Sequence, residues 1–434
     1  MRDGKPKWLF VDMNAYFASV EQQVCPELRG RPTAVVPVMA DSTCCIAVSY
    51  EAKKYGIKTG TKVSAARRLC PDLQLVESRP ALYVKYHKKI IEAVNTVLPV
   101  EQVHSIDEMS CKLIGRQRSP DCAVSLAKDI KQSIKECVGK YLLCSVGIAP
   151  NRFLSKVASN MEKPNGLTLI TEDELPQKLY SLSLSDLPGI GSGMLRRLNL
   201  HGVNSVAQLC SLSQSQCSGI WHSVVGKRWW HLLRGDDLQE FPTKRRTVSH
   251  SHVLHPGMRT DSGMHSVLTK LIHKAGARLR RLNYYAGRMS IQIAYFNTQK
   301  SWESYMKLEQ FQDTQTMIKA FLEMWPKRPA GKTPLRVSVV LSALIPTAET
   351  SLPLFSDESR RIKLAETMDR INERYGLDCL YFGTMHNAKE AAPMRISFTS
   401  IPDLISEGTA YDRALSVSDS TRNIEDNKLE TNYY

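Results

Sequence analysis

The sequence predicts a multidomain α+β protein, because the chain is long and because the order strand, helix, two strands, helix, strand occurs in it twice. A chain of 434 residues exceeds what a single hydrophobic core usually organises. The repeated order is that of a split βαβ, or ferredoxin-like, sheet. We therefore expect two such sheets with shared topology, although no internal sequence repeat is evident.

Local patterns define the elements of the first sheet. The apolar run from Trp8 to Val11 predicts a strand that ends at Asp12, and residues 15–23 predict a helix. Apolar residues recur on one side of 81–98, which is typical of an amphipathic helix. The later elements are strands at 103–106 and 109–114, a helix at 123–137 and a strand at 142–148. Residues 25–78, rich in Gly, Pro and Lys, are expected to form an insertion.

The second half of the chain begins with a segment that is expected to be all-helical, 171–234, followed by a polar and basic linker, 235–246. The second sheet should combine strands at 247–254, 286–296, 301–310 and 335–344 with helices at 261–283 and 314–325. After Pro346 we expect an apolar pentad, one helix and two short strands. The polar stretch from about Ser406 predicts disorder.

The composition narrows the class of partner. A net charge of +15 and a pI of about 9.3 favour a polyanion, nucleic acid before membrane. No stretch is apolar and long enough to predict a membrane span, and the first residues are not expected to form a signal peptide, because they lack its apolar core. The 11 cysteines are scattered without a Cys-x-x-Cys pair, which favours free thiols in a reducing cytoplasm over disulfides or zinc.

Three carboxylates lie beside apolar, strand-like segments. Asp12 ends the first strand, and Asp107 and Glu108 lie between two predicted strands. Carboxylates held side by side near a core are costly unless a positive charge lies among them. A divalent metal site explains them and indicates phosphoryl chemistry on a polyanion. From these residues alone, a solvent-facing pair at a hairpin turn is an equal alternative.

Five motifs occur in order: Val-Asp-Met-Asn-Ala-Tyr-Phe-Ala-Ser-Val-Glu at 11–21, Ser-Tyr-Glu-Ala-Lys at 49–53, Ser-Ile-Asp-Glu at 105–108, Ser-Val-Gly-Ile-Ala at 145–149 and Lys-Pro-Asn-Gly at 163–166. Together they closely resemble the Y-family translesion DNA polymerases of the bacterial DinB/UmuC type. The resemblance covers about residues 7–345, and the tail is most similar to the UmuC branch. Five ordered motifs favour the metal site over the hairpin turn.

The resemblance implies the fold of a right-hand polymerase. Its ferredoxin-like palm would comprise 1–14 and 80–170, its small fingers 15–79, and its helical thumb 171–234. The linker would be 235–246, the second split βαβ domain (the little finger) 247–345, and the tail 346–434.

The resemblance also implies the catalytic residues. Asp12, Asp107 and Glu108 would hold two Mg²⁺ ions, with the backbone carbonyl of Met13 as a further ligand. The incoming dNTP would be bound by Tyr16, Phe17, Tyr50, Lys53 and Lys163. Lys53 stands where the family commonly has arginine, so a bidentate phosphate contact would be lost.

Phe17 matches the steric gate of the family, a ring under the sugar that excludes a 2′-hydroxyl and so selects deoxynucleotides. Outside this motif, a lone Phe on an amphipathic helix would be a core aromatic.

Two further sets of residues suggest contacts with the DNA backbone. Gly189, Gly191 and Gly193 precede a helix, where backbone N–H groups can approach phosphate. Because no strand precedes them, a dinucleotide site is excluded, whereas a tight interhelical turn remains an alternative. The family counterpart is a helix-hairpin-helix. Arg278, Arg280 and Arg281 crowd one helix, which is either a solvated face or, in this family, a DNA-binding surface of the little finger.

The pentad Ser-Leu-Pro-Leu-Phe at 351–355 resembles the sliding-clamp-binding peptide of bacterial polymerases, although that motif usually begins with Gln where Ser351 stands. Leu352, Leu354 and Phe355 would bind the clamp. A strand that anchors the tail is the alternative. The need for a UmuD-like accessory subunit is left open.

The function expected from the resemblance is low-fidelity, template-directed DNA synthesis on primer–template DNA, by two-metal transfer of dNTPs to a primer 3′-hydroxyl. Its setting would be translesion synthesis and DNA repair in the SOS response, in the cytoplasm. One rival is a catalytically inactive homologue that acts as an adaptor between clamp and polymerase. Another is a non-enzymatic, basic DNA-binding protein.

Overall fold

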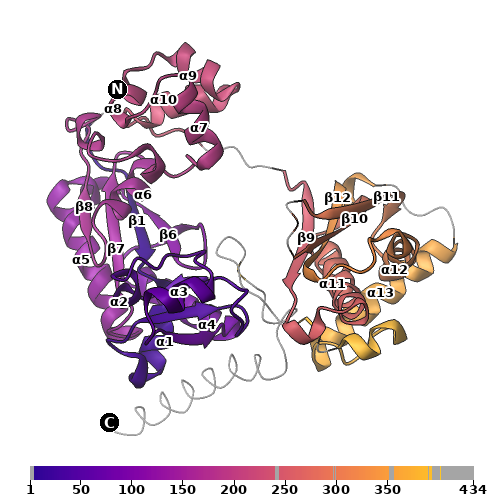
Figure 1. The fold of residues 1–434 in the computed structure, drawn as a ribbon. Coiled ribbons are helices and arrows are strands. Elements are labelled where there is room, and N and C mark those ends of the chain that lie inside the picture. Colours follow the sequence, from indigo (N-terminus) through magenta and orange to yellow (C-terminus); the bar gives the residue numbers. More distant parts are fainter. Residues whose placement is uncertain are drawn as a thin grey trace, which may run out of the picture. The chain divides into compact units, whose positions relative to one another are not determined.

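The computed structural model describes residues 4–239, 244–296, 298, 300–350, 356–389, 391–392 and 401 (Figure 1). The chain divides into two compact units, which are described separately. The N-terminal unit consists mainly of residues 1–79 and 83–241, and the C-terminal unit mainly of 242–396. None of the described helices is long and apolar enough to cross a membrane.

The N-terminal unit is built on a five-stranded sheet of order β5-β6-β1-β7-β8. Its strands are β1 (Trp8–Met13), β5 (Val100–Val103), β6 (Glu108–Lys112), β7 (Cys144–Ala149) and β8 (Leu167–Leu169). Neighbours are antiparallel except β7 and β8. Because β6 separates β5 from β1, the predicted split βαβ arrangement is confirmed. Residues 104–107, expected at the end of a strand, form the turn that joins β5 to β6.

Four helices accompany this sheet: α1 (Tyr16–Val24), α4 (Pro80–Asn95), α5 (Pro120–Cys137) and α6 (Arg152–Met161). Helix α6 packs on β7 and β1 (Figure 1). Gly147 permits this close approach, because a Cβ on it would lie 2.1 Å from the Ser155 carbonyl oxygen and 2.3 Å from the Ser159 nitrogen. The absent side chain therefore sets how near α6 lies to the sheet.

The segment expected as an insertion forms a separate three-stranded sheet of order β3-β2-β4. It comprises β2 (Thr33–Val36), β3 (Ala47–Val48) and β4 (Gln74–Glu77), with α2 (Tyr50–Lys53) and α3 (Val63–Leu69). Buried side chains from Ala34 to Leu73 give it its own core.

The segment 171–234 contains no strand and is helical, as predicted. Its α-helices are α7 (Ser192–Leu200), α8 (Val206–Ser211), α9 (Gln214–Trp221) and α10 (Val224–Leu232). Leu187, Ile190, Leu198 and Trp229 lie in a core that also includes residues of α6. This shared core fixes the glycine-rich turn before α7 relative to α6.

The C-terminal unit has a four-stranded antiparallel sheet of order β11-β10-β12-β9. Its elements are β9 (Thr247–Val253), α11 (Asp261–Arg281), β10 (Tyr284–Tyr295), β11 (Trp302–Phe311), α12 (Thr314–Met324) and β12 (Pro334–Pro346).

The two sheets share their order of elements but not their topology. In the N-terminal sheet the third strand lies between the first and second, whereas in the C-terminal sheet the fourth strand, β12, lies there. The expected shared topology is therefore wrong at the level of strand order. In both sheets another strand lies between the first two strands. The order of elements along the chain does not determine whether that is the third strand or the fourth.

Residues after the second sheet pack against α11. The tail forms α13 (Ser356–Tyr375) and a 3₁₀ segment, Gly383–Ala388, and no strand occurs in its described part. Arg280 binds Asp369, and Lys270 binds Asp378. The pentad 351–355 and the stretch predicted to be disordered lie outside the described residues.

Candidate active site

The three predicted carboxylates come from one edge of the N-terminal sheet. Asp12, near the end of β1, is the register partner of Glu108, the first residue of β6. The Met13 amide donates to the Asp107 carbonyl oxygen at 2.9 Å, and the His104 amide donates to that of Glu108 at 2.9 Å. The turn is thus tied to the end of β1. The sequence alone left two interpretations, a metal site near the core and a solvent-facing pair at a hairpin turn. The carboxylates do lie at a hairpin turn, as the second interpretation has it, but they are largely shielded from water, as the first has it.

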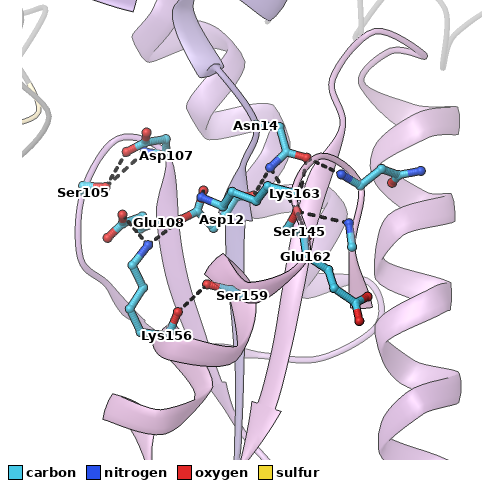
Figure 2. Close-up of polar contacts among 12 residues, drawn as sticks. Asp12, Asn14, Ser105, Asp107, Glu108, Ser145, Lys156, Ser159, Glu162 and Lys163 are labelled. Atoms are coloured by element: carbon cyan, nitrogen blue, oxygen red, sulfur yellow. Dashed lines mark hydrogen bonds and ion pairs between the residues drawn. The ribbon is translucent and has the colours of Figure 1, made fainter. Parts of the chain in front are cut away.

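Two lysines from α6 and the loop after it bind these carboxylates (Figure 2). Lys163 Nζ lies 2.7 Å from Asp12 Oδ1. Lys156 Nζ donates to Asp12 Oδ2 and lies 2.7 Å from Glu108 Oε1. The side chain of Asp12 is only 6% exposed, so the lysines compensate a charge that water solvates poorly.

Asp107 is turned toward a different partner. Its carboxylate accepts a hydrogen bond of 2.6 Å from the Ser105 hydroxyl. Burial raises the pKa of Asp107 to about 6, although this hydrogen bond lowers it, and the negative charges of Glu108 and Asp12 raise it further. Burial is thus the main cause of the raised pKa of Asp107, and repulsion by the neighbouring carboxylates adds to it.

Lys156 keeps its positive charge at this edge. Burial lowers the pKa of Lys156, but the Asp12 and Glu108 carboxylates together raise it above its ordinary value. Sequence reasoning missed Lys156. The available signal was its place on α6, between the motifs at 145–149 and 163–166, at a position not filled by an apolar residue.

Tyr50 and Lys53 lie on α2, on the same side of the unit as Asp12. The Lys53 ammonium lies 4.1 Å from the centre of the Tyr50 ring. Burial lowers the pKa of Lys53 and the Lys163 ammonium lowers it further, while Asp12 raises it. Burial raises the pKa of Tyr50 to about 12, with a contribution from Asp12. The charge of Asp12 at the carboxylate edge therefore raises the pKa of both residues.

One cavity joins the carboxylate edge to Lys53, whereas Tyr50 is not among its lining residues. Its volume is about 580 Å³, and its lining includes both lysines at the carboxylate edge, Lys53 and the turn before α7. Among its lining residues are Asp12, Met13, Tyr16, Lys53, Asp107, Glu108, Lys156, Lys163, Gly189 and Gly191. The structure thus brings most of the predicted catalytic and nucleotide-binding residues to one space.

The two adjacent aromatic residues of α1 differ in their placement. Tyr16 lines the cavity, and its hydroxyl donates to the Tyr83 carbonyl oxygen at 2.6 Å. Phe17 is 1% exposed, and its ring stacks on that of Tyr83 with centroids 4.5 Å apart. Phe17 is not among the residues that line the cavity. The core packing weighed from the sequence is therefore what the structure shows for this ring.

The predicted glycine-rich turn opens helix α7. Gly189 has a φ of +99°, a conformation that side chains rarely adopt, and Gly191 is the N-cap of α7. Residues 185–191 line the cavity beside Asp12. Gly193 is the second residue of α7, and a Cβ at this position would contact no other atom within 4 Å.

The three arginines predicted to bind DNA have other surroundings. Arg280 donates to both oxygens of Asp369, at 2.6 and 2.8 Å, and to the Gln312 carbonyl oxygen at 2.7 Å. Its side chain is 7% exposed, so it is a structural residue and not an available phosphate ligand. Arg281 lines a cavity between α11 and α13, and Arg278 lies near His250, whose pKa burial and these cations lower to about 3.

One face of the C-terminal sheet carries charged side chains of both signs, Arg288 and Lys307 together with Glu303 and Glu309. Helices α11 and α12 pack on the face that carries Met289, Ile291 and Val337. Arg288 alternates with Met289 and therefore points to the other face, where its register partner is Lys307. We call this the open face of the sheet, because no described helix packs on it.

The carboxylate edge has the donors that a divalent cation requires. Its oxygen ligands are hard, and like-charge repulsion acts on Asp107, so a cation would relieve it. However, no three His, Cys, Asp or Glu side chains in the described parts of the chain are gathered closely enough to form a complete metal cluster. Lys156 joins Asp12 to Glu108, and Asp107 turns to Ser105. The carboxylate oxygens of these residues are suitable ligands for a divalent cation, although in this structure they bind Lys156 and Ser105.

We expect Asp107→Asn to raise the free energy of unfolding of the N-terminal unit at pH 7.5 by about 3 kcal/mol, because an amide avoids the cost of burying the charge. The pKa of Asp107 rises from 3.8 to about 6 on folding, so this cost grows as pH rises between these values. Well below pH 3.8 the carboxyl is protonated in both states, so the gain should be small at pH 4 and vanish at lower pH. Urea unfolding in EDTA from pH 4 to 7.5 measures it. The control is Asp129→Asn, an exposed carboxylate on α5; a gain independent of pH would contradict the prediction.

Comparison with known proteins identifies relatives of both units. The chain matches the impB/mucB/samB family at residues 11–160 and the C-terminal domain of that family at 245–354. It is 30% identical to the DNA polymerase IV of Moorella thermoacetica over 380 residues, which are 85% of this chain and 93% of the relative. It is 27% identical to the DNA polymerase IV of Bacillus velezensis over 406 residues, 91% of this chain and 97% of the relative.

Solved structures support the fold. A "Y-family DNA polymerase chimera Dbh-Dpo4(243-245)-Dbh" matches with a TM-score of 0.64 and 23% identity, covering 78% of this chain and 99% of the other. An "Insertion ternary complex of Dbh DNA polymerase" matches with a TM-score of 0.52 and 24% identity, with the same coverage. With the family matches and the polymerase relatives, these findings show that the chain belongs to the Y family of translesion DNA polymerases, the DinB/UmuC type.

Proposed function

We propose that this chain is a template-directed DNA polymerase that adds dNTPs to a primer 3′-hydroxyl and copies past damaged template bases. The observation that carries the proposal is the cavity in which Asp12, Asp107 and Glu108 meet Lys53, Lys156 and Lys163. Carboxylates provide sites for metal ions, and lysines provide sites for phosphate. The family membership supports this assignment of the cavity.

Within this proposal, Asp12, Asp107 and Glu108, with the Met13 carbonyl, would hold two Mg²⁺ ions. Bound Mg²⁺ would supply Lewis acidity and charge stabilisation for an attack of the 3′-hydroxyl on the α-phosphate. The chain itself would hold the ligands at one edge and keep Ser105 hydrogen-bonded to Asp107. Because the side chain of Asp12 is only 6% exposed, access of water to this carboxylate is limited.

We propose that Lys163, Lys53, Tyr50 and Tyr16 bind the incoming nucleotide. Lys163 already lies beside Asp12, and Lys53 is influenced by both. Lysine binds phosphate as a point charge without the bidentate fork of arginine, so Lys53 should hold the triphosphate less rigidly than an arginine would.

The names given to parts of the fold follow the same proposal. The palm would be 1–14 with 80–170, the fingers 15–79, the thumb 171–234 and the little finger 247–345. Magnesium as the metal, the SOS response, a cytoplasmic setting, a sliding clamp that binds 351–355 and a UmuD-like subunit stay predictions from sequence.

We expect Asp107→Ala to abolish Mg²⁺-dependent primer extension, a loss of 100-fold or more on the order seen when a group that stabilises transition-state charge is removed. Gel-based extension on primer–template DNA measures it, and Asp129→Ala on α5 is the control. If the wild-type chain binds DNA without extending the primer, the adaptor or the non-enzymatic DNA-binding protein is the better assignment. Retention of all three carboxylates favours the enzyme.

Phe17→Ala tests the steric gate. If Phe17 lies under the sugar, its removal should raise ribonucleotide incorporation relative to deoxynucleotide incorporation by about 100-fold, because a 2′-hydroxyl would then fit. Its stacking on Tyr83 predicts instead a loss of stability with an unchanged ratio. Single-nucleotide kinetics with dCTP and CTP, together with thermal unfolding, distinguish these results. An unchanged ratio in folded protein rejects the gate.

We further propose that the open face of the C-terminal sheet contacts DNA phosphates, in place of Arg280. Arg288→Ala and Lys307→Ala should each weaken binding of duplex DNA and reduce the slope of log affinity against log salt by about 0.9. Lys319→Ala on α12, which packs on the opposite face, is the matched control. Fluorescence anisotropy at several salt concentrations measures the slopes. Equal slopes in the three variants would place the contact elsewhere.

A further inference from the structure

The loop that presents Lys163 is a tight turn between α6 and β8, residues 162–166. Its tightness depends on Gly166, because a Cβ there would lie 1.8 Å from the Glu162 carbonyl oxygen. A lysine side chain is long and flexible, so the position of its backbone decides which phosphates its ammonium can reach. What holds this turn in place therefore matters for the proposed nucleotide site.

Ser145, on β7, and Asn14, after β1, hold the turn from within the sheet (Figure 2). The Gly166 amide donates to Ser145 Oγ at 3.1 Å, and that hydroxyl donates to the Glu162 carbonyl oxygen at 3.1 Å. The Asn165 amide donates to Asn14 Oδ1 at 2.7 Å. Asn14 and Ser145 are 2% and 0% exposed, so water cannot replace these hydrogen bonds without a rearrangement.

Lys131, on α5, holds the turn from another element. Its ammonium donates to the carbonyl oxygens of Asn165 at 2.6 Å, Gly166 at 3.0 Å and Cys144 at 3.2 Å. An ammonium group has three donors, and here they join two residues of the turn to the first residue of β7. Lys131 is not among the residues that line the cavity.

We infer that Lys131, Asn14 and Ser145 are positioning residues for nucleotide binding, which fix the turn 162–166 so that Lys163 meets the triphosphate of the incoming dNTP. The inference rests on the proposed role of Lys163. Together the three side chains engage the Glu162, Asn165 and Gly166 backbones on either side of Lys163. Lys131 carries the inference furthest, because it reaches the turn without touching the carboxylate edge.

The test is steady-state incorporation by the full chain on primer–template DNA, with Lys131→Met as the main variant. We expect the KM for dNTP to rise about tenfold while kcat changes less than threefold, because a displaced turn weakens a binding contact and leaves the carboxylates in place. Lys131→Arg, which retains the charge and several donors, should restore most of the affinity. Lys135→Met, an exposed lysine on the same helix, is the matched control.

Two further measurements separate positioning from stability. Binding of dNTP to the complex with a dideoxy-terminated primer should weaken by the same factor in Lys131→Met, whereas affinity for DNA alone should not change. If Lys131→Met does not fold, Ser145→Ala, which removes one hydroxyl, should raise the KM in the same direction. A lower melting temperature and active fraction with an unchanged KM would overturn the inference.

The outcomes also separate this inference from the proposed function. If Lys163→Ala raises the KM for dNTP and Lys131→Met does not, the inference fails and the proposed site stands. If neither variant raises the KM, the role of Lys163 fails, and the inference fails with it. If the wild-type chain incorporates no nucleotide, the proposed function itself is overturned.

Discussion

The buried charge of Asp12 constrains the N-terminal unit more than any other feature. A carboxylate this far from water is stable only with cations beside it, and Lys156 and Lys163 provide them from α6 and from the turn that follows it. Helix α6 must therefore lie close to the sheet, and Gly147 permits this. The register of β1 against β6 is equally constrained, because a slip by one residue would turn Asp12 or Glu108 to the wrong face.

The same balance of charge suits the proposed chemistry. A site for a triphosphate and metal ions must accommodate groups of both signs that arrive together. Under the proposed function, Lys163 has two anionic partners, Asp12 and phosphate, and Asp12 has two cationic partners, lysine and metal. Exchange between these pairs would keep the cavity close to neutral while its contents change, and this limits the electrostatic cost of each binding step.

The sequence was informative where one local pattern decides the outcome. Apolar periodicity located the elements of the C-terminal sheet and most of those of the N-terminal sheet, but not α6 or β8, and it placed Asp12 at the end of the first strand. Contacts between side chains from distant segments of the chain could not be predicted from local patterns. Lys156 is 144 residues from Asp12, and Lys131 binds carbonyl groups that every residue possesses, so neither contact leaves a pattern. Arg280 resembled a surface cation because its partner, Asp369, lies on α13, 89 residues further along the chain and outside the recognised motifs.

The ion pairs of the tail mean that the matched C-terminal family domain and the folded unit end at different residues in this chain. The family match ends at residue 354, but the carboxylates that pair with Arg280 and Lys270 lie at 369 and 378. A C-terminal fragment cut at the end of this domain match would retain both cations in positions shaped for partners that it lacks. The smallest autonomous form of this unit should therefore include α13 and the residues up to Asp378, beyond the end of the C-terminal domain match.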